Sequence, residues 1–303
     1  MNAVLVDVGA PATCHPLTCT RNLADCPVAN RPLAEAQRQR LQAAGFGNDA
    51  ATGARLFLRG DAWLSVALLQ ALRSSQSPTA VVTADGQTLA HTGTAPDVSP
   101  TVAILPADAE SFAIRFPWDL LRINEILVGA LAESRIEAQV SANVIIDGIL
   151  VAGVGTRILP GVYVEGKVIV GRNCKIGPNC YLRGSTAIGD DCHIGQAVEV
   201  KNSIIMSRSA LPHLSYCGDS IIGERVNFGA GTIAANFRHD GGHHWSRIRG
   251  EVVDTGRRKF GTVMGDHVHT GINTSIYPGR KLWPHVSTLP GEVVQADKET
   301  PHG

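Results

Sequence analysis

Residues 237–261 hold a dense group of side chains that could bind a charged ligand. Three histidines, His239, His243 and His244, could bind a metal ion, but the Asp-Gly-Gly sequence at 240–242 is typical of a turn and favours an exposed hairpin tip. Five cations follow: Arg247, Arg249, Arg257, Arg258 and Lys259. Converging cations bind phosphate, whereas the same residues along a solvated strand edge bind nothing. The residues alone leave both interpretations of the cations open.

The seven cysteines predict neither a disulfide framework nor a metal centre. Their number is odd, and Cys14, Cys19 and Cys26 lack the close paired spacing of ordinary zinc sites. Cys174 and Cys192 lie three hexads apart, which predicts that they pack one above the other inside a repeating structure. We therefore expect no bound metal.

A six-residue repeat must position any site in the second part of the chain. Its apolar positions are Val140, Ile146, Ala152, Ile158, Val164, Val170, Ile176, Leu182, Ile188, Ile194, Val200 and Met206. Such a hexapeptide repeat predicts a parallel β-helix, in which each hexad forms one flat face and the coils stack on one another. Prisms of this kind usually work as trimers with sites between neighbouring copies, so we expect a homotrimer.

The repeat breaks in two places. It slips at residues 211–216, resumes at Ile222, and is interrupted over residues 237–261 before it returns at Met264. Breaks in a solenoid cost stacking contacts and often mark loops with another use. We therefore expect the chemistry at these two breaks.

Residues 1–133 alternate short apolar strands with amphipathic stretches, which predicts an α/β domain with parallel strands. Helices are expected at 33–44, 64–73 and 118–131, the last with Pro117 at its start. Residues 86–100, rich in Thr, Gly, Pro and Asp, predict a loop. The predicted organisation is an α/β domain over 1–133 and a β-helix domain over 134–303.

The composition narrows the classes of partner. Lys and Arg number 27 and Asp and Glu number 27, so bulk charge does not favour nucleic acid or a membrane surface. The first residues lack the features of a signal peptide, and no apolar run approaches the ~20 residues that span a bilayer. These features predict a cytoplasmic protein that acts on small molecules.

Several motifs together resemble a known family. They are Val198-Glu-Val-Lys-Asn-Ser, Pro212-His-Leu-Ser-Tyr, Gly218-Asp219 and Val226-Asn-Phe-Gly-Ala-Gly-Thr-Ile. This block resembles the left-handed β-helix acetyltransferase domain of the bifunctional glucosamine-1-phosphate acetyltransferase/N-acetylglucosamine-1-phosphate uridylyltransferase family. Asp254-Thr-Gly-Arg-Arg-Lys-Phe-Gly and Thr270-Gly-Ile-Asn are closer still to the archaeal-type sugar-1-phosphate nucleotidylyltransferase/acetyltransferases. The resemblance covers roughly residues 140–290 and implies a left-handed parallel β-helix.

The resemblance also implies roles for single residues. His213 would be the general base that removes a proton from an acceptor amine, a task that suits a side chain titrating near neutrality. The sugar-phosphate ligands would be Arg183, Lys201, Tyr216, Asn227 and Lys259. Ala230, Asn236 and Gly271 would lie against the cosubstrate acetyl-CoA. One departure is Ile272, where the bacterial enzymes carry a serine, and this leaves the acyl group open.

The N-terminal part resembles a sugar nucleotidylyltransferase that has lost its key residues. Val28-Ala-Asn-Arg-Pro-Leu is similar to a segment of those enzymes, which hold a triphosphate with a Gly-rich turn, an arginine and a lysine. Here Pro11, Thr13 and Leu23 stand at those positions, and none of them can supply the missing amide or charge. The domain is also shorter than its relatives, so we expect nucleotidylyl transfer to be lost.

The leading hypothesis is an acetyl-CoA-dependent N-acetyltransferase that acts on glucosamine 1-phosphate or galactosamine 1-phosphate. Three alternatives stay open. They are an acyltransferase for a different amine acceptor in a specialised pathway, a nucleotidyltransferase with a cryptic site, and a non-catalytic trimeric scaffold or regulatory partner.

Overall fold

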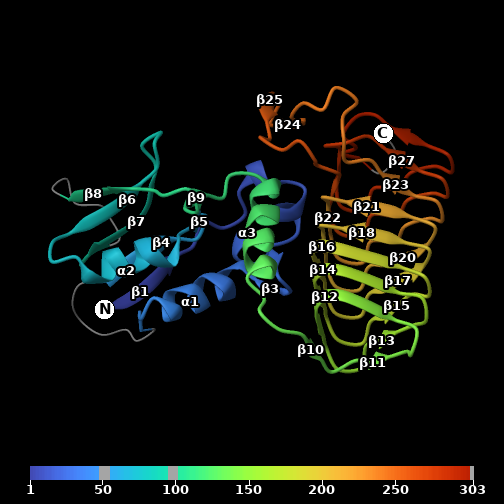
Figure 1. Cartoon of the computed structure of the whole chain (residues 1–303). Coiled ribbons are helices and arrows are strands. Elements are labelled where there is room, and N and C mark those ends of the chain that lie inside the picture. Colours follow the sequence, from blue (N-terminus) through green and yellow to red (C-terminus); the bar gives the residue numbers. More distant parts are fainter. Residues whose placement is uncertain (48–54, 95–101, 301–303) are drawn as a thin grey trace. The chain divides into compact units, whose positions relative to one another are not determined.

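The computed structural model describes residues 1–47, 55–94 and 102–300, which form two compact units (Figure 1). The first unit comprises Met1–Pro11, Asn22–Cys26 and Arg31–Arg115. The second comprises Ala12–Arg21, Pro27–Asn30 and Phe116–Gly303. The second unit therefore includes two short segments from the N-terminal part of the sequence, while the domain boundary at 133/134 stays a prediction.

The first unit is built on a five-stranded sheet with the strand order β1-β4-β7-β6-β8. The five strands are β1 (Asn2–Val6), β4 (Arg55–Arg59), β7 (Thr88–Gly93), β6 (Thr79–Val82) and β8 (Ala103–Pro106). Strand β1 pairs with β4 in parallel, whereas β7 is antiparallel to both of its neighbours. The helices and strands of an α/β unit are present, but the prediction of an all-parallel sheet is wrong.

A hairpin explains the difference. Strands β6 and β7 are joined by a tight turn at Asp85-Gly86, where Gly86 has φ +87° and its amide donates to the Thr83 carbonyl at 2.9 Å. An Asp-Gly pair between apolar runs is a strong hairpin signal because it supplies positive φ without strain. The predicted loop at 86–100 is therefore wrong over 88–93, and residues 95–100 lie outside the described residues.

The three predicted helices are present as α1 (Leu33–Ala43), α2 (Val66–Ser74) and α3 (Pro117–Gly129). Ser65 caps α2 by accepting a hydrogen bond from the Leu68 amide at 3.1 Å. Helix α3 belongs to the second unit and starts at Pro117, whose fixed φ suits a first helical position. No helix in the described part of the chain combines the length and apolar character needed to cross a bilayer.

Shorter elements complete the N-terminal part. They are the 3-10 helices η1 (Ala12–Cys14), η2 (Leu17–Cys19) and η3 (Leu23–Asp25) and the strands β2 (Pro27–Val28), β3 (Arg31–Pro32), β5 (Ala62–Trp63) and β9 (Phe112–Ala113).

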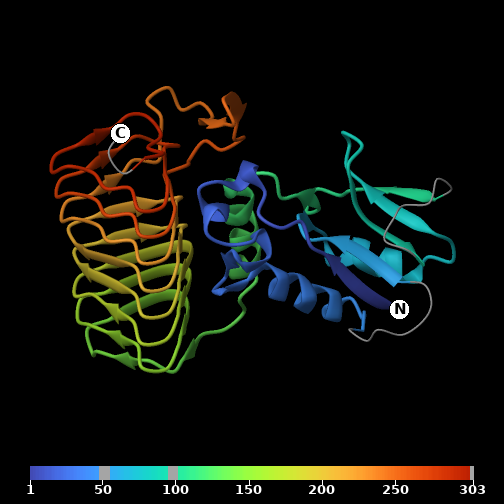
Figure 2. The same cartoon turned by 180° about the vertical axis from the view of Figure 1, so that it is seen from behind.

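The second unit is a stack of parallel coils (Figure 2), as the hexads predict, and the expected left-handed parallel β-helix is confirmed. Each coil hydrogen-bonds to the one before it, so that Tyr163 pairs with Tyr181 and Tyr181 with Glu199, 18 residues further on each time. Apolar side chains point inward and form one continuous core from Leu150 to Val294. Cys174 and Cys192 are buried in this core, which confirms the prediction that they are interior residues.

Two sheets carry most of the strands of this unit. The larger has thirteen strands: β10 (Arg135–Ile136), β12 (Ile145–Ala152), β14 (Tyr163–Val170), β16 (Tyr181–Ile188), β18 (Glu199–Lys201), β19 (Ile204–Ile205), β21 (Tyr216–Gly218), β22 (Ile221–Ile222), β23 (Ile233–Ala234), β26 (Val263–Met264), β27 (Ser275–Ile276), β28 (Lys281–Leu282) and β29 (Val293–Val294). The smaller has five: β11 (Gln139–Val140), β13 (Arg157–Ile158), β15 (Lys175–Ile176), β17 (His193–Gln196) and β20 (Ala210–His213).

The strand register places the slip of the repeat earlier than the sequence predicts. Arg183 pairs with Lys201 at a spacing of 18 residues, but Ala187 pairs with Ile204 at a spacing of 17. One residue is therefore missing from the corner at 202–203, and Ile205, not Met206, occupies the inward slot next to Ile188. Met206 is buried outside that core, with its sulfur 2.6 Å from Nη1 of Arg21.

The interruption forms an antiparallel hairpin of β24 (Trp245–Ile248) and β25 (Glu251–Asp254). Its tip lies at Arg249-Gly250, where both residues have positive φ, and the tip expected at 240–242 is an ordinary turn that precedes the hairpin. The histidines of this segment do not converge. His243 Nδ1 contacts Asp254 at 3.2 Å, whereas His244 Nε2 contacts the Asn236 carbonyl at 3.1 Å.

The inward position of Ile205 predicts that its side chain stabilises the core of the β-helix. Ile205→Ala removes a buried side chain and is expected to lower the free energy of unfolding of the β-helix by about 2–5 kcal/mol. Ile145→Ala, at a side chain that is 57% exposed, is expected to change it by less than about 0.5 kcal/mol. Denaturant unfolding of both variants measures the difference, and equal effects would contradict the inward position of Ile205.

Candidate functional site

The candidate site lies where one face of the β-helix passes into the next. Strand β20 ends at His213, Leu214 turns the chain with φ +48°, and β21 begins at Tyr216. His213 therefore ends β20, the last strand of the five-stranded sheet, whereas Tyr216 begins β21, which pairs with β18 and β23 inside the thirteen-stranded sheet. The corner connects these two predicted site residues across the two sheets.

Arg183 and Lys201 stand on neighbouring strands of the larger sheet and pair directly in register. Arg183 donates to Glu199 Oε1 from Nε at 2.8 Å, and its Nη2 lies 2.7 Å from the same oxygen. Lys201 Nζ lies 2.9 Å from Asp219 Oδ2. Both cations are therefore held in ion pairs within the same chain.

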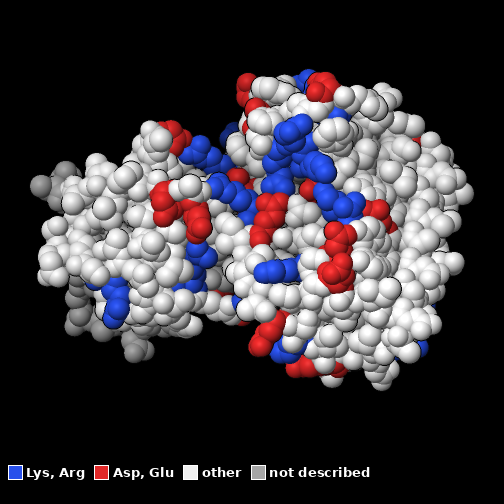
Figure 3. All heavy atoms as spheres, in the orientation of Figure 1, with Lys and Arg blue, Asp and Glu red and all other residues white. Residues whose placement is uncertain are grey.

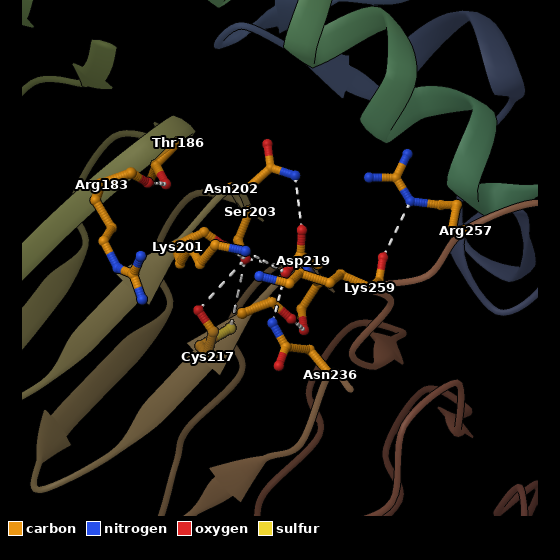
Figure 4. A network of polar contacts seen from close by, with 12 residues as sticks. Arg183, Thr186, Lys201, Asn202, Ser203, Cys217, Asp219, Asn236, Arg257 and Lys259 are labelled. Carbon is orange, nitrogen blue, oxygen red and sulfur yellow. Dashed lines mark hydrogen bonds and ion pairs between the residues drawn. The ribbon is translucent and has the colours of Figure 1, made fainter. Parts of the chain in front are cut away.

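Asp219 is the centre of the polar network in Figure 4. Its side chain is 4% exposed and accepts hydrogen bonds from three residues. Lys201 Nζ and Asn236 Nδ2 donate to Oδ2 at 2.9 and 2.5 Å, and Asn202 Nδ2 donates to Oδ1 at 2.9 Å. A buried carboxylate needs such donors because leaving it without partners would cost several kcal/mol. The network thus joins Lys201 and Asn236, which the sequence assigned to different ligands.

Tyr216 and Asn236 meet above Gly218. A methyl group on Gly218 would come within 2.6 Å of Asn236 Nδ2 and closer still to the Tyr216 hydroxyl, so a larger residue at this position would displace the ends of both side chains. Burial, followed by the charges of Glu199 and Asp219, raises the pKa of Tyr216 to about 12. The phenol is therefore a neutral hydrogen-bond group over the whole physiological range.

Lys259 reaches this region from the interruption. Its backbone forms an antiparallel bridge with Phe237, directly after Asn236, and its side chain is exposed. The preceding Arg257 is anchored to helix α3, since its Nη2 lies 2.5 Å from Glu125 Oε1. Glu125 Oε1 also accepts from Asn202 Nδ2 at 2.7 Å. Helix α3 thereby connects the segment of Lys259 with the corner that holds Asp219.

His213 has an exposed side chain. Its carbonyl accepts a hydrogen bond from Ser215 Oγ at 2.7 Å, and within the described residues no hydrogen bond or ion pair of its imidazole is recorded. In the preceding coil, His193 is half-buried, and burial, then Lys175 and His213, lower the pKa of His193. The His213 ring is accordingly accessible to a ligand that approaches from solvent.

Asn227, Ala230 and Gly271 lie on the coils that follow. Asn227 is exposed and forms isolated bridges with Ala210 and His269 on the side of the five-stranded sheet. Ala230 and Gly271 are half-buried at successive corners, and Gly271 stacks closely against Gly229. Among these residues no direct hydrogen bond to His213 or Lys201 is recorded in the described part of the chain.

Sequence reasoning missed Glu199, Asp219 and Glu125. Asp219 reads as an ordinary corner residue in Gly218-Asp219, and only the slip to 17-residue coils would have aligned it with Asn202. Glu125 is distant in sequence from both of its partners, so no local signal could reveal it. Each of these carboxylates forms an ion pair with an arginine or a lysine. Figure 3 shows Lys and Arg directly beside Asp and Glu on this face of the second unit.

Known proteins are similar to the part of the chain that carries this site. Residues 164–288 match the family model described as GMPPB C-terminal domain. The bifunctional sugar-1-phosphate nucleotidylyltransferase/acetyltransferase of Sulfurisphaera tokodaii is 50% identical over 101 residues, which are 33% of this chain and 25% of that protein. The bifunctional protein GlmU of Methanococcus aeolicus is 46% identical over 166 residues, which are 55% of this chain and 40% of that protein.

These relatives cover the C-terminal half. The resemblance that the motifs predict is thereby confirmed for that half. The chain spans less than half the length of each of these two relatives. A solved putative acetyltransferase of Bacillus cereus is 15% identical with a TM-score of 0.30 and covers 50% of this chain and 71% of that one.

The crowding above Gly218 predicts a measurable change in Tyr216. Gly218→Ala is expected to push the phenol out of its buried position, so that the pKa of Tyr216 falls from about 12 toward the ordinary value of about 10. Ultraviolet absorbance of tyrosinate at pH 11 would then rise by nearly one tyrosine. Tyr216→Phe in the Gly218→Ala background should abolish this increase.

The matched control is Gly129→Ala, where an added methyl group meets open space. It should leave the tyrosine titration unchanged. An unchanged titration in Gly218→Ala as well would contradict the close packing of Tyr216 above Gly218.

Proposed function

We propose that the chain is an N-acetyltransferase that moves the acetyl group of acetyl-CoA to the amine of an amino-sugar 1-phosphate. The observation that carries the proposal is the convergence of Arg183, Lys201 and Tyr216 on adjacent strands beside the corner of His213, in the half that matches the bifunctional relatives. Glucosamine 1-phosphate and galactosamine 1-phosphate are the proposed acceptors.

The cations of the site are held in place by ion pairs and could bind a phosphate through their remaining hydrogen-bond donors. Glu199 and Asp219 already pair with Arg183 and Lys201, so these two cations add little net charge. An ammonium has three donors, and Lys201 uses one of them on Asp219, which leaves donors for a phosphate oxygen. Lys259, exposed on the neighbouring segment, would supply the additional positive charge.

In the proposed reaction His213 acts as the general base. The acceptor nitrogen attacks the thioester carbonyl, the C–N bond forms, and the C–S bond breaks to release coenzyme A as the thiolate. His213 takes the proton that the amine loses, which favours attack because only the unprotonated amine is nucleophilic. The exposed imidazole supports this role, since it is accessible to an incoming amine.

Acetyl-CoA, the acetyl donor, would lie along the corners of Ala230 and Gly271. Small residues at half-buried corners allow a ligand to approach the backbone closely. Asn236 would lie between donor and acceptor, since it contacts both Asp219 and the region of Tyr216. We also propose a homotrimer, in which the exposed side of His213 would face a neighbouring copy.

We propose further that nucleotidylyl transfer is absent. Leu23, at the position of the family's lysine, is fully buried in η3, and its amide donates to the Gly9 carbonyl at 2.9 Å. A buried leucine cannot neutralise a triphosphate. Arg21, two residues before it, is used in an ion pair with Asp266 at 2.5 Å.

The proposal predicts substrate-dependent release of coenzyme A thiol. The purified full chain with acetyl-CoA should turn over glucosamine 1-phosphate or galactosamine 1-phosphate, and should not turn over glucosamine or glucosamine 6-phosphate. His213→Ala is expected to lower kcat by about 10²- to 10⁴-fold, because the amine then loses its proton acceptor. Thiol release followed with a disulfide dye measures both effects.

His193→Ala is the matched control, because it removes a neighbouring imidazole that has no proposed contact with substrate. It should retain most of the activity. Turnover of unphosphorylated amines would show that the acceptor is not an amino-sugar 1-phosphate. A lack of turnover with any amine would contradict the proposed activity and favour a non-catalytic scaffold. Pyrophosphate release from UTP and a sugar 1-phosphate would contradict the proposed loss of nucleotidylyl transfer.

A further inference from the structure

Asp219 contacts groups that the proposed function assigns to both substrates. Lys201, on the acceptor side, and Asn236, on the donor side, donate to the same oxygen, Oδ2, at 2.9 and 2.5 Å. The carboxylate is 4% exposed, so it does not itself meet a ligand from solvent. Its influence on a ligand must pass through Lys201 and Asn236.

The carboxylate also fixes the orientation of the Asn236 amide. An ionised carboxylate only accepts hydrogen bonds, so it must face the Nδ2 end of the amide. Nδ2 also lies beside the Tyr216 hydroxyl above Gly218. The carbonyl oxygen of Asn236 is thereby directed away from Asp219, in one defined orientation.

Asn202 links Asp219 to Glu125 on helix α3. Asn202 Nδ2 donates one hydrogen to Asp219 Oδ1 at 2.9 Å and the other to Glu125 Oε1 at 2.7 Å. Glu125 also binds Arg257, two residues before Lys259. A chain of hydrogen bonds therefore runs from Glu125 through Asn202 to Asp219 and ends at Lys201 and Asn236.

We infer that Asp219 is a positioning residue that sets Lys201 and Asn236 together, so that a single buried carboxylate determines the affinity for both the amino-sugar phosphate and acetyl-CoA. This inference rests on the proposed function for the identity of the two substrates. It does not make Asp219 a catalytic residue, since Asp219 touches neither substrate.

The test is steady-state kinetics of Asp219→Asn in the full chain, with each substrate varied in turn. The replacement keeps the shape and tolerates the φ of +50° at this corner, but it removes the negative charge that pairs with Lys201 and leaves one acceptor oxygen in place of two. The donors of Lys201 and Asn236 on one side and of Asn202 on the other can then no longer all be accepted. The loss of charge-assisted hydrogen bonds of this kind weakens binding roughly tenfold or more. KM is expected to rise at least about tenfold for both substrates, with a smaller change in kcat.

Asp266→Asn is the matched control. Asp266 is also buried and also accepts from an arginine, a hydroxyl and a backbone amide, at 2.5, 2.7 and 2.8 Å, but none of these groups belongs to the proposed site. It should lower thermal stability without raising either KM. A rise of KM for only one substrate in Asp219→Asn, or equal effects in both variants, overturns the inference.

A second variant covers the case in which Asp219→Asn does not fold. Asn202→Gly removes the amide between Glu125 and Asp219 and suits the φ of +46° at residue 202, since Gly184 occupies the same corner in the preceding coil with φ +69°. It should raise both KM values in the same direction by a smaller factor. Unchanged KM values in this variant count against the inference.

Lysine labelling separates failure of this inference from failure of the proposed function. An amine-reactive acetyl ester, read by peptide mass spectrometry, should modify Lys201 several-fold faster in Asp219→Asn than in the wild type, because the ion pair is lost. Asp266→Asn should not change that rate. If the wild type transfers no acetyl group, the proposed function fails, and the labelling alone then decides whether Asp219 holds Lys201.

Discussion

Every coil of the β-helix must hydrogen-bond to the coil before it while the chain turns sharply at the corners, and this requirement organises the rest of the structure. Corner residues such as Asn202 and Asp219 adopt positive φ, of 46° and 50°. Asn and Asp tolerate this conformation better than most residues because their short polar side chains bond locally. When two such corners stack, an amide and a carboxylate come into contact, and the site's polar network begins there.

The periodicity of the sequence predicted the architecture well, because the inward slots of a solenoid are a local pattern. It could not locate the slip. Ile204, Ile205 and Met206 are three consecutive apolar residues, and only pairing with the neighbouring coil decides which of them points inward. In the first unit the reason is different, because the Asp-Gly pair at residues 85–86 is a local hairpin signal that the alternation of strands and helices does not take into account.

For the candidate site, the motifs predicted the side chains that are proposed to bind a ligand, but not the carboxylates that hold them. Glu199 and Asp219 compensate Arg183 and Lys201, which makes the cations fixed donors more than sources of net charge. Neither pair is expected to contribute much to stability, because solvent screens the half-buried Arg183–Glu199 pair and desolvation offsets the attraction in the more buried Lys201–Asp219 pair. Their effect is on orientation, since a donor that is already ordered loses less entropy when it binds a ligand.

The N-terminal segments of the second unit have a structural reason to persist, independent of any nucleotide chemistry. Arg21 binds Asp266, the Ala29 amide donates to Asn124 Oδ1 at 2.9 Å, and Asn30 Nδ2 donates to the Ile188 carbonyl. Asn124 lies on helix α3, directly before Glu125, which bonds Asn202 and Arg257. These contacts fix the helix on which the network around Asp219 depends. On this argument, substitutions in residues 27–30 would act on the β-helix site through the position of α3.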